Sequence, residues 1–263
     1  MKTALVTGSS GYIGSLLVQQ LRIGGWKVIT FDIADHRLED INNTNLEKIF
    51  EQEQFDVVFH LAAVSSVHEC TENLQRTYAT NALSTIRLHE LCKRYNCKMI
   101  FASTYATVTE NWTTYSMSKE VAEFELLKEG SKAVVVRLPN VIGGYDGVQP
   151  KSTPSLFDNI MAYIKTGKPL IIYGNAWREY TSVQNAVSRL YNAVANSKEG
   201  EVDLVSGAFA CDISRLISNI EMATKAKIVY ETRPPIDPQN YSRLSEYRFD
   251  HGLLRKVIDS YDL

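Results

Sequence analysis

Cysteine and histidine are scarce in this sequence. It has four cysteines, Cys70, Cys92, Cys97 and Cys211, and no two of them show C-x-x-C spacing. This number and arrangement exclude a disulfide framework, so we expect reduced, buried thiols. The five histidines are scattered and form no H-x-x-x-H pair. A metal site is therefore not expected.

A strong net charge and a long apolar run are also missing. The formal net charge is −2, so no global field would attract nucleic acid or an anionic membrane surface. No uninterrupted apolar stretch approaches the ~20 residues of a membrane-spanning helix. The first residues, MKTALVTGSSGYIG, contain a short apolar run that ends in glycines and lack a signal-peptide core and cleavage site. We expect a cytoplasmic protein with neither a nucleic-acid nor a membrane partner.

The 263 residues, 44% hydrophobic and 22% charged, have the composition of an ordinary globular protein. Up to residue 138, short β-branched runs alternate with segments of helical spacing. The runs predict strands at 3–7, 27–31, 56–63, 98–103 and 133–138, and the other segments predict helices at 12–23, 45–52, 73–95 and 115–128. This alternation favours an α/β fold with a doubly wound parallel sheet.

The pattern changes after Leu138. Pro139, Gly143, Gly144, Gly147, Pro150 and Pro154 lie close together, as in a crossing loop or a domain boundary. Less regular elements follow, with helices predicted at 156–165, 185–195, 213–224 and 252–260 and strands at 170–173, 202–205 and 228–231. We predict a first domain over 1–150 and a smaller α/β substrate domain over 151–263, with 185–205 returning to the first.

A glycine motif follows the first predicted strand. TGSSGYIG places Gly8, Gly11 and Gly14 in the pattern G-x-x-G-x-x-G, between a strand and a helix. Such a loop lets the backbone approach a pyrophosphate at the N-terminus of a helix. A tight turn without a ligand is the alternative, but the position in the first strand–helix unit favours a dinucleotide site.

Asp32 lies at the end of the second predicted strand, 18 residues after Gly14. An acidic residue there typically binds the adenine ribose hydroxyls and repels a 2′-phosphate, which favours NAD over NADP. A solvated loop aspartate is the alternative. Arg37 weakens the preference, since an arginine can accept a 2′-phosphate.

Tyr115 and Lys119 are four residues apart at the start of a predicted helix, in the stretch TTYSMSKEVAEF. Residues at this spacing share one helical face. The lysine charge favours phenolate and lowers the pKa of a nearby tyrosine, which makes the phenol a usable proton donor or acceptor. An amphipathic surface pair is the alternative.

These motifs occur in the order that is typical of one family. The glycine motif, DVVFHLAA, Asn81 in the long helix, FAST, Y-x-x-x-K and RLPNVIG together resemble the extended short-chain dehydrogenases/reductases, in the NAD-dependent epimerase/dehydratase group that acts on nucleotide sugars. The resemblance covers nearly the whole chain and is strongest over 1–143. It implies a Rossmann-like fold, NAD as cofactor, a nucleotide-sugar substrate and a homodimer.

The resemblance also implies roles for individual residues. Tyr115 resembles the acid/base, Lys119 the ligand of the nicotinamide ribose, and Thr104 the hydroxyl that binds the reacting sugar hydroxyl. The implied cofactor site consists of Gly8, Gly11, Tyr12, Ile13, Gly14, Asp32, Asp40, Ile41, Leu61, Ala62, Ala63, Tyr115 and Lys119. Thr104, Asn140 and Arg178 are implied as substrate ligands, the latter two at the nucleotide phosphates. For Thr104, a strand-end hydroxyl that caps a backbone group is the alternative. For Asn140 it is pinning the Pro139 turn, and for Arg178, a surface salt bridge. His60 is expected to be a core histidine.

The sequence departs from the family pattern at several positions. Only ten residues separate Thr104 from Tyr115, where a longer loop usually walls the sugar pocket. Tyr105 and Ala106 stand where sugar 4,6-dehydratases carry acidic residues, so dehydration is disfavoured. Gln184 and Asn185 replace the usual aspartates. These changes affect the expected sugar more than the expected cofactor.

The expected function is that of an NAD-dependent nucleotide-sugar 4-epimerase. A reductase of a nucleotide 4-keto sugar is the first alternative, because VHECTENLQRTYATN resembles the dehydrorhamnose reductases. A regulatory dinucleotide-binding protein without catalysis is the second, against which the intact set of Thr104, Tyr115 and Lys119 argues. The sugar and the nucleotide stay open.

Overall fold

A parallel sheet forms the centre of the molecule. The computed structural model describes residues 1–34, 40–43, 45–108, 112–143, 155–207, 209–234 and 249–261. The six strands of the sheet are, in spatial order, β2 (Lys27–Phe31), β1 (Thr3–Thr7), β3 (Val57–His60), β4 (Lys98–Thr104), β5 (Ala133–Leu138) and β9 (Val202–Leu204), and all pairs are parallel. Strands β1, β3 and β5 are buried almost throughout, which explains why their sequences are mostly apolar.

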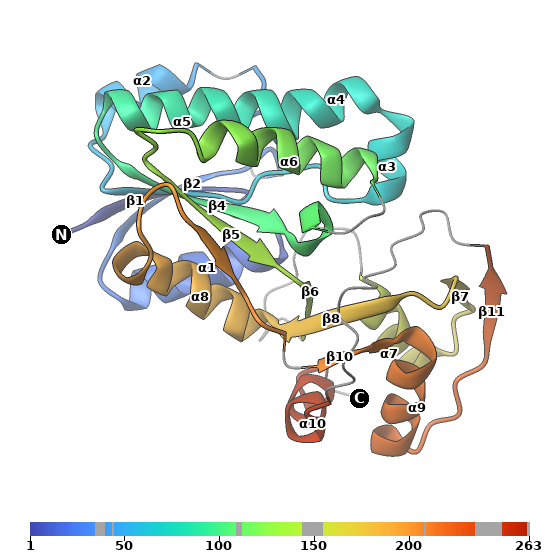
Figure 1. Cartoon of the computed structure of the whole chain (residues 1–263). Helices are drawn as coiled ribbons and strands as arrows, with labels where there is room; N and C mark the ends of the chain where they lie inside the picture. The colour runs from blue at the N-terminus through green and yellow to red at the C-terminus, as the bar shows by residue number, and fades with distance from the viewer. Residues whose placement is uncertain are drawn as a thin grey trace.

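Helices cover both faces of this sheet (Figure 1). One layer contains α2 (Leu46–Gln52), α5 (Ser84–Arg94) and α6 (Thr114–Leu126), and the opposite layer contains α1 (Tyr12–Ile23) and α8 (Val183–Asn196). Each layer packs its own apolar cluster against the sheet. The predicted doubly wound α/β fold is confirmed. From β1 the chain continues to β2 on one side and then to β3 on the other side of β1. Such folds bind ligands at the crevice next to β1, where this change of direction occurs.

The long helix predicted over 73–95 is present and contains a π turn. It begins with α4 (Leu74–Tyr78), passes through the π turn Ala79–Leu83 and continues as α5. A short helix before it, α3 (Val67–Glu72), was not predicted, because its six residues are mostly polar. Single π turns inside α-helices are often found at functional sites.

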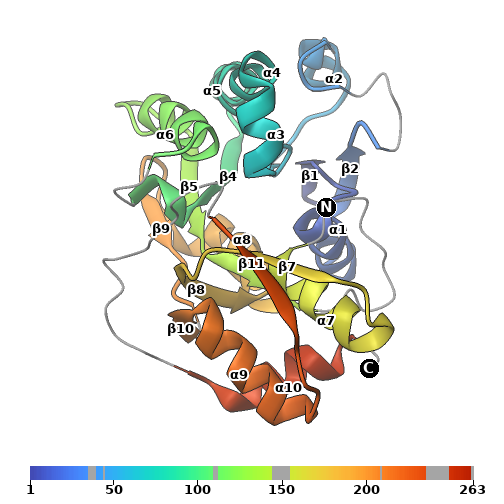
Figure 2. The same ribbon diagram turned by 90° about the vertical axis from the view of Figure 1, so that its right-hand side faces the viewer.

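The C-terminal part forms two small sheets and a separate apolar core. One sheet contains β10 (Phe209–Asp212), β8 (Trp177–Ser182) and β6 (Asn140–Ile142), and the other contains β11 (Tyr230–Arg233) and β7 (Leu170–Tyr173). The helices are α7 (Leu156–Thr166), α9 (Ile213–Thr224) and α10 (His251–Asp259), and they surround the third core cluster (Figure 2).

Three strands of this part correct the sequence prediction. β6 lies in the interval expected to be a loop, and β8 and β10 were not predicted. β11 begins at Tyr230, two residues after the predicted start. The predicted domain boundary at residue 150 lies outside the described residues. Beyond it, α8 packs against α1 and β9 pairs with β5, with Val202 opposite Val135.

None of the helices in the described ranges combines the length and the hydropathy needed to cross a membrane.

Candidate functional site

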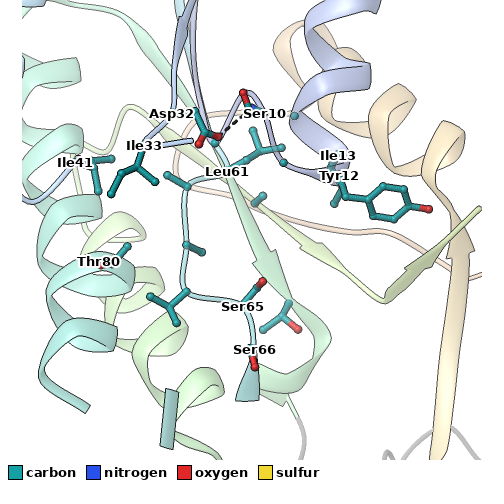
Figure 3. A pocket seen from close by; sticks show the side chains of 18 of the residues that line it. Ser10, Tyr12, Ile13, Asp32, Ile33, Ile41, Leu61, Ser65, Ser66 and Thr80 are labelled. Atoms are coloured by element: carbon teal, nitrogen blue, oxygen red, sulfur yellow. Dashed lines mark hydrogen bonds between the residues drawn. The ribbon is translucent and has the colours of Figure 1, made fainter. Parts of the chain in front are cut away.

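A cleft of about 510 Å³ opens at the carboxyl ends of the central strands. Every residue that the resemblance implies for the cofactor lines this cleft, and so does Thr104. The cleft therefore brings together segments that are far apart in the chain, from Gly8 in the loop after β1 to Lys119 on helix α6. Figure 3 shows part of the lining, with Asp32, Ile33 and Ile41 on one side of Leu61 and Tyr12 and Ile13 on the other.

The glycine loop lies very close to the rest of the backbone. Gly8 has a φ of +71°, and a Cβ atom on it would lie 2.6 Å from the Ala62 nitrogen. A Cβ on Gly14 would lie 2.0 Å from the Gly8 oxygen. Only glycine fits these two positions. Gly11 precedes helix α1 and provides no side chain to cap its first turn, so this helix end is suited to a phosphate.

The carboxylate of Asp32 is held at the rim of the glycine loop. The Ser10 backbone N–H donates to Oδ2 at 2.9 Å (Figure 3), and the Ala34 N–H donates to Oδ1 at 2.8 Å. Asp40 is also held, since the Asn42 N–H donates to its Oδ1 at 2.9 Å. Both carboxylates line the cleft together with Ile41. Arg37, which bears on the choice between NAD and NADP, lies outside the described residues.

Helix α6 begins next to the cleft because Thr113 caps it. Thr113 and Ser116 form a reciprocal capping box, with the Ser116 N–H donating to the Thr113 Oγ1 at 3.0 Å. This start places Tyr115 and Lys119 on the cleft. Lys119 is only 2% exposed. Its Nζ donates to the Ala102 carbonyl at 3.0 Å and lies 4.5 Å from the centroid of the Phe101 ring.

Burial changes the acidity of the Lys119 ammonium. It lowers the pKa of Lys119 to about 8, and the nearby carboxylate of Glu123 opposes this effect. Lys119 therefore provides a positive charge beside the cleft at neutral pH and loses it in mildly alkaline solution.

Thr104 ends strand β4 and begins the turn that leads away from it. Its Oγ1 accepts a hydrogen bond from the Ala106 N–H at 3.2 Å. The Thr107 hydroxyl donates to the Thr104 carbonyl at 2.9 Å. These bonds hold the backbone of Thr104, so its hydroxyl has a defined position at the cleft.

Asn81, in the π turn, bonds to groups on two sides of the cleft. Its Oδ1 accepts from the Val64 N–H at 2.8 Å, and its Nδ2 donates to the Val64 carbonyl at 2.9 Å and to the Ser118 Oγ at 3.0 Å. Val64 belongs to the cleft lining and Ser118 to helix α6. The asparagine thus connects the loop after β3 to the helix of Tyr115.

His60 is a core residue, as the sequence predicted. It is fully buried between two threonine hydroxyls, with Nδ1 2.7 Å from Thr7 Oγ1 and Nε2 2.8 Å from Thr85 Oγ1. Burial, with a smaller contribution from the Lys119 charge, lowers the pKa of His60 to about 3. A neutral imidazole held in this way supports the strands and does not transfer protons near neutral pH.

Asn140 and Arg178 lie together but are not among the residues that line the cleft. They come from the neighbouring strands β6 and β8, and an Arg178 Nη donates to the Asn140 Oδ1 at 3.4 Å. The Asn140 Nδ2 donates to the Glu179 carbonyl at 3.1 Å. The buried Nε of Arg178 has no hydrogen-bond partner among the described residues.

Several lining residues were missed by sequence reasoning, among them Ser65, Ser66, Arg76, Ser155 and Asp158. Ser155 and Asp158 form a capping box at the start of α7. The pattern S-x-x-D before an apolar run is a known signature of a helix start, so these two were within reach of the sequence. The other three lie on α4 and in the loop after β3, where no local pattern marks them.

The comparisons with known proteins agree with the resemblance seen in the sequence. The Arabidopsis thaliana protein bifunctional UDP-glucose 4-epimerase and UDP-xylose 4-epimerase 3 is 27% identical over 258 residues, covering 78% of this chain and 72% of that protein. A UDP-glucose 4-epimerase of Pisum sativum is 27% identical over 261 residues, covering 79% and 73%.

Solved structures share the fold over almost the whole length. A UDP-glucose 4-epimerase from Thermotoga maritima, crystallised with UDP-glucose, has a TM-score of 0.81 at 22% identity and covers 99% of this chain and 98% of its own. MoeE5 in complex with UDP-glucose and NAD has a TM-score of 0.81 at 21% identity, with the same coverage. The model of the NAD dependent epimerase/dehydratase family matches residues 4–205, and the chain therefore belongs to this family.

Proposed function

We propose that this protein is an NAD-dependent UDP-sugar 4-epimerase. The observation that carries the proposal is that one cleft contains the glycine loop, Asp32 and the trio Thr104, Tyr115 and Lys119. The first group suits a dinucleotide and the second suits proton transfer at a sugar hydroxyl. The curated relatives named above, which are 4-epimerases of UDP-sugars, support the same activity.

The residues of the cleft fit NAD. The close approach of Gly8 and Gly14 to neighbouring backbone leaves a smooth cradle in front of helix α1, as a pyrophosphate requires. The Asp32 carboxylate, fixed by two backbone N–H groups, can accept hydrogen bonds from ribose hydroxyls and would repel a 2′-phosphate. Lys119, with its Nζ at the cleft, suits the nicotinamide ribose.

The chemistry of this chain is proton transfer and orientation. When bound, NAD supplies a reversible acceptor for the hydride at the sugar C4. Tyr115 takes the proton of the C4 hydroxyl and later returns it. Thr104 holds the reacting oxygen, and the Lys119 charge stabilises the phenolate form of Tyr115. The 4-keto sugar must turn in the cleft before the hydroxyl is restored on the opposite face.

Arg178 and Asn140 are the proposed ligands of the nucleotide diphosphate. The unpartnered Nε of Arg178 supports this role, because a buried guanidinium donor without an acceptor favours an anionic ligand. Rotation of the Arg178 and Asn140 side chains would bring their donors towards a ligand that extends from the cleft.

Neither a dehydratase nor a reductase is supported to the same degree. Tyr105 and Ala106, which follow Thr104, are both buried and carry no carboxylate for water loss. The reductase depends on the single segment after residue 66, whereas the relatives support the epimerase.

We also propose a homodimer in a reducing compartment such as the cytoplasm. The helices α4 and α6 and the π turn between α4 and α5 carry exposed apolar side chains: Leu74, Leu83, Met117, Val121 and Phe124. Such a patch on adjacent helices favours a symmetric helix–helix contact.

All four cysteines are free and buried, which fits a reducing compartment.

The test is to incubate the NAD-loaded protein with UDP-glucose, UDP-xylose or UDP-N-acetylglucosamine in the absence of NADH. We expect the C4 epimer to appear in the NMR spectrum, and Tyr115→Phe serves as the control. If no sugar interconverts but a nucleotide 4-keto sugar consumes stoichiometric NADH, the protein is a reductase.

A further inference from the structure

A carboxylate is buried on helix α6, behind the proposed catalytic residues Tyr115 and Lys119. Glu123 lies one helical turn after Lys119 on α6 and is only 2% exposed. A buried charge is costly unless it is paired and hydrogen-bonded, so the partners of the Glu123 carboxylate decide what this residue does.

The carboxylate of Glu123 connects three elements. Arg137 of β5 donates from Nε to both oxygens at 3.1 Å and from an Nη to Oε2 at 2.5 Å. The Ser103 hydroxyl of β4 donates to Oε1. The Thr107 hydroxyl lies 3.4 Å from the same oxygen. One side chain on α6 thus holds the carboxyl ends of the neighbouring strands β4 and β5, where Ser103 lies opposite Arg137.

These contacts enclose Thr104. Ser103 precedes it, and Thr107 donates to its carbonyl at 2.9 Å. Ser103 is therefore hydrogen-bonded to Glu123, and Thr107 contacts the same carboxylate oxygen while donating its proton to Thr104. Tyr115 and Lys119 belong to the same helix as Glu123, so the distance between the Thr104 hydroxyl and Tyr115 depends on how α6 is attached to β4.

The chain connection between Thr104 and Tyr115 is only ten residues long. A short connection provides little wall around the site, and the contacts of Glu123 link α6 directly to the end of β4. Replacing a buried ion pair by apolar residues is often neutral for stability, so stability alone does not account for this pair.

We propose that Glu123, paired with Arg137, is a positioning residue that sets the separation between Thr104 and Tyr115. Its catalytic consequence rests on the proposed epimerase function, whereas its effect on the end of β4 does not.

The first experiment measures hydrogen exchange in Glu123→Gln, which keeps the volume and loses the charge. We expect the amides of residues 103–108 to exchange roughly tenfold faster or more, because a charged acceptor is lost. Residues 3–14 should exchange as in the parent. The double variant Glu123→Met/Arg137→Met removes both members of the ion pair and should show the same local loosening. Parent-like exchange at 103–108 in a folded variant overturns the proposal.

The second experiment is a double-mutant cycle on kcat with the sugar that the parent interconverts. We expect Glu123→Gln to lower kcat roughly 10–100-fold with little change in the Kd for NAD, because a small displacement of reacting groups is costly. In a Thr104→Ala background the same change should cost less than about threefold, since the effect acts through Thr104. Equal losses in both backgrounds contradict the proposal. Leu216→Ala, in the C-terminal core, controls for lower stability alone.

The two experiments distinguish failure of the epimerase function from failure of the positioning role of Glu123. A parent that interconverts no sugar refutes the epimerase and leaves the exchange result to decide on Glu123. An active parent with additive effects refutes the positioning role and leaves the epimerase intact.

Discussion

At the scale of single residues, Tyr115 is the side chain on which turnover should depend most. Tyr115→Phe removes the phenol oxygen and keeps the ring that lines the cleft. We expect kcat to fall about 10²–10⁴-fold, the contribution of a general acid/base, with NAD binding and thermal stability retained. Steady-state kinetics with calorimetric NAD titration check this. A near-parent kcat would leave Tyr115 as a packing residue only.

Asp32 has two roles that different variants separate. Asp32→Asn keeps an oxygen that can accept from the Ser10 N–H and removes the charge, whereas Asp32→Ala removes both. The charge disfavours a 2′-phosphate, so we expect both variants to lose part of the preference for NAD over NADP. Asp32→Ala should also weaken NAD binding more than Asp32→Asn does, because the glycine loop then loses its anchor altogether. Calorimetry with both cofactors checks this, and tighter NADP binding by the parent contradicts it.

The sequence predicted those site residues whose relative positions follow from short spacings within one motif. The glycine loop and the pair Tyr115 and Lys119 each lie within one strand–helix unit, so their geometry follows from short-range structure. Arg178 and Asn140 meet only because β6 and β8 pair, 38 residues apart in the chain. No local pattern shows whether such a pair faces the cleft.

At the scale of elements, the sequence predicted long amphipathic helices and the strands of the central sheet, and it missed the short strands β6, β8 and β10. Helix α1 was predicted over 12–23 as observed, because its apolar spacing ends at two glycines. Strand β8, WREYTS, shows no clear alternation, and β6 has three residues after a proline. Both are strands because of partners far away in the chain, which propensity does not reveal.

His60 connects three elements and should make the fold sensitive to acid. Its ring nitrogens contact Thr7 on β1 and Thr85 on α5, while His60 itself ends β3. Its pKa is lowered from 6.5 to about 3, so the unfolded chain binds a proton that the folded chain excludes between these values. The contribution is complete above pH 6.5 and is lost as the pH falls towards 3. It amounts to on the order of 4–5 kcal/mol.

The measurement is urea unfolding at several pH values in the parent and in His60→Gln. We expect the difference in the free energy of unfolding between the two to become smaller as the pH falls from 6.5 to 4. A difference that does not vary with pH would mean that His60 is not the group responsible.

At the scale of the whole molecule, the apolar patch on α4, α6 and the π turn should determine the oligomeric state. Val121 and Phe124 are 43% and 69% exposed on α6. Val121→Glu/Phe124→Glu places charges at the proposed two-fold contact and should give monomers, because like charges would face each other and apolar burial would be lost. Light scattering at micromolar concentration measures the mass. Met222→Glu, at an equally exposed apolar site on α9, should stay dimeric, and a monomeric parent contradicts the proposal.

The π turn at Ala79–Leu83 bears on how this chain tolerates a change in its length. A π turn holds one residue more than the α-helical turn it replaces, and each α-helical residue rotates the following side chains by about 100°. Loss of Ala82 would therefore close the turn into an ordinary α-helix and leave the buried faces of α4 and α5, with Thr77 and Leu88, in their orientation. Loss of a residue within α5 would instead turn Leu88 and Leu91 away from the sheet. The long helix thus has one place at which evolution could delete a residue without disturbing the core, and it is the turn that holds Asn81.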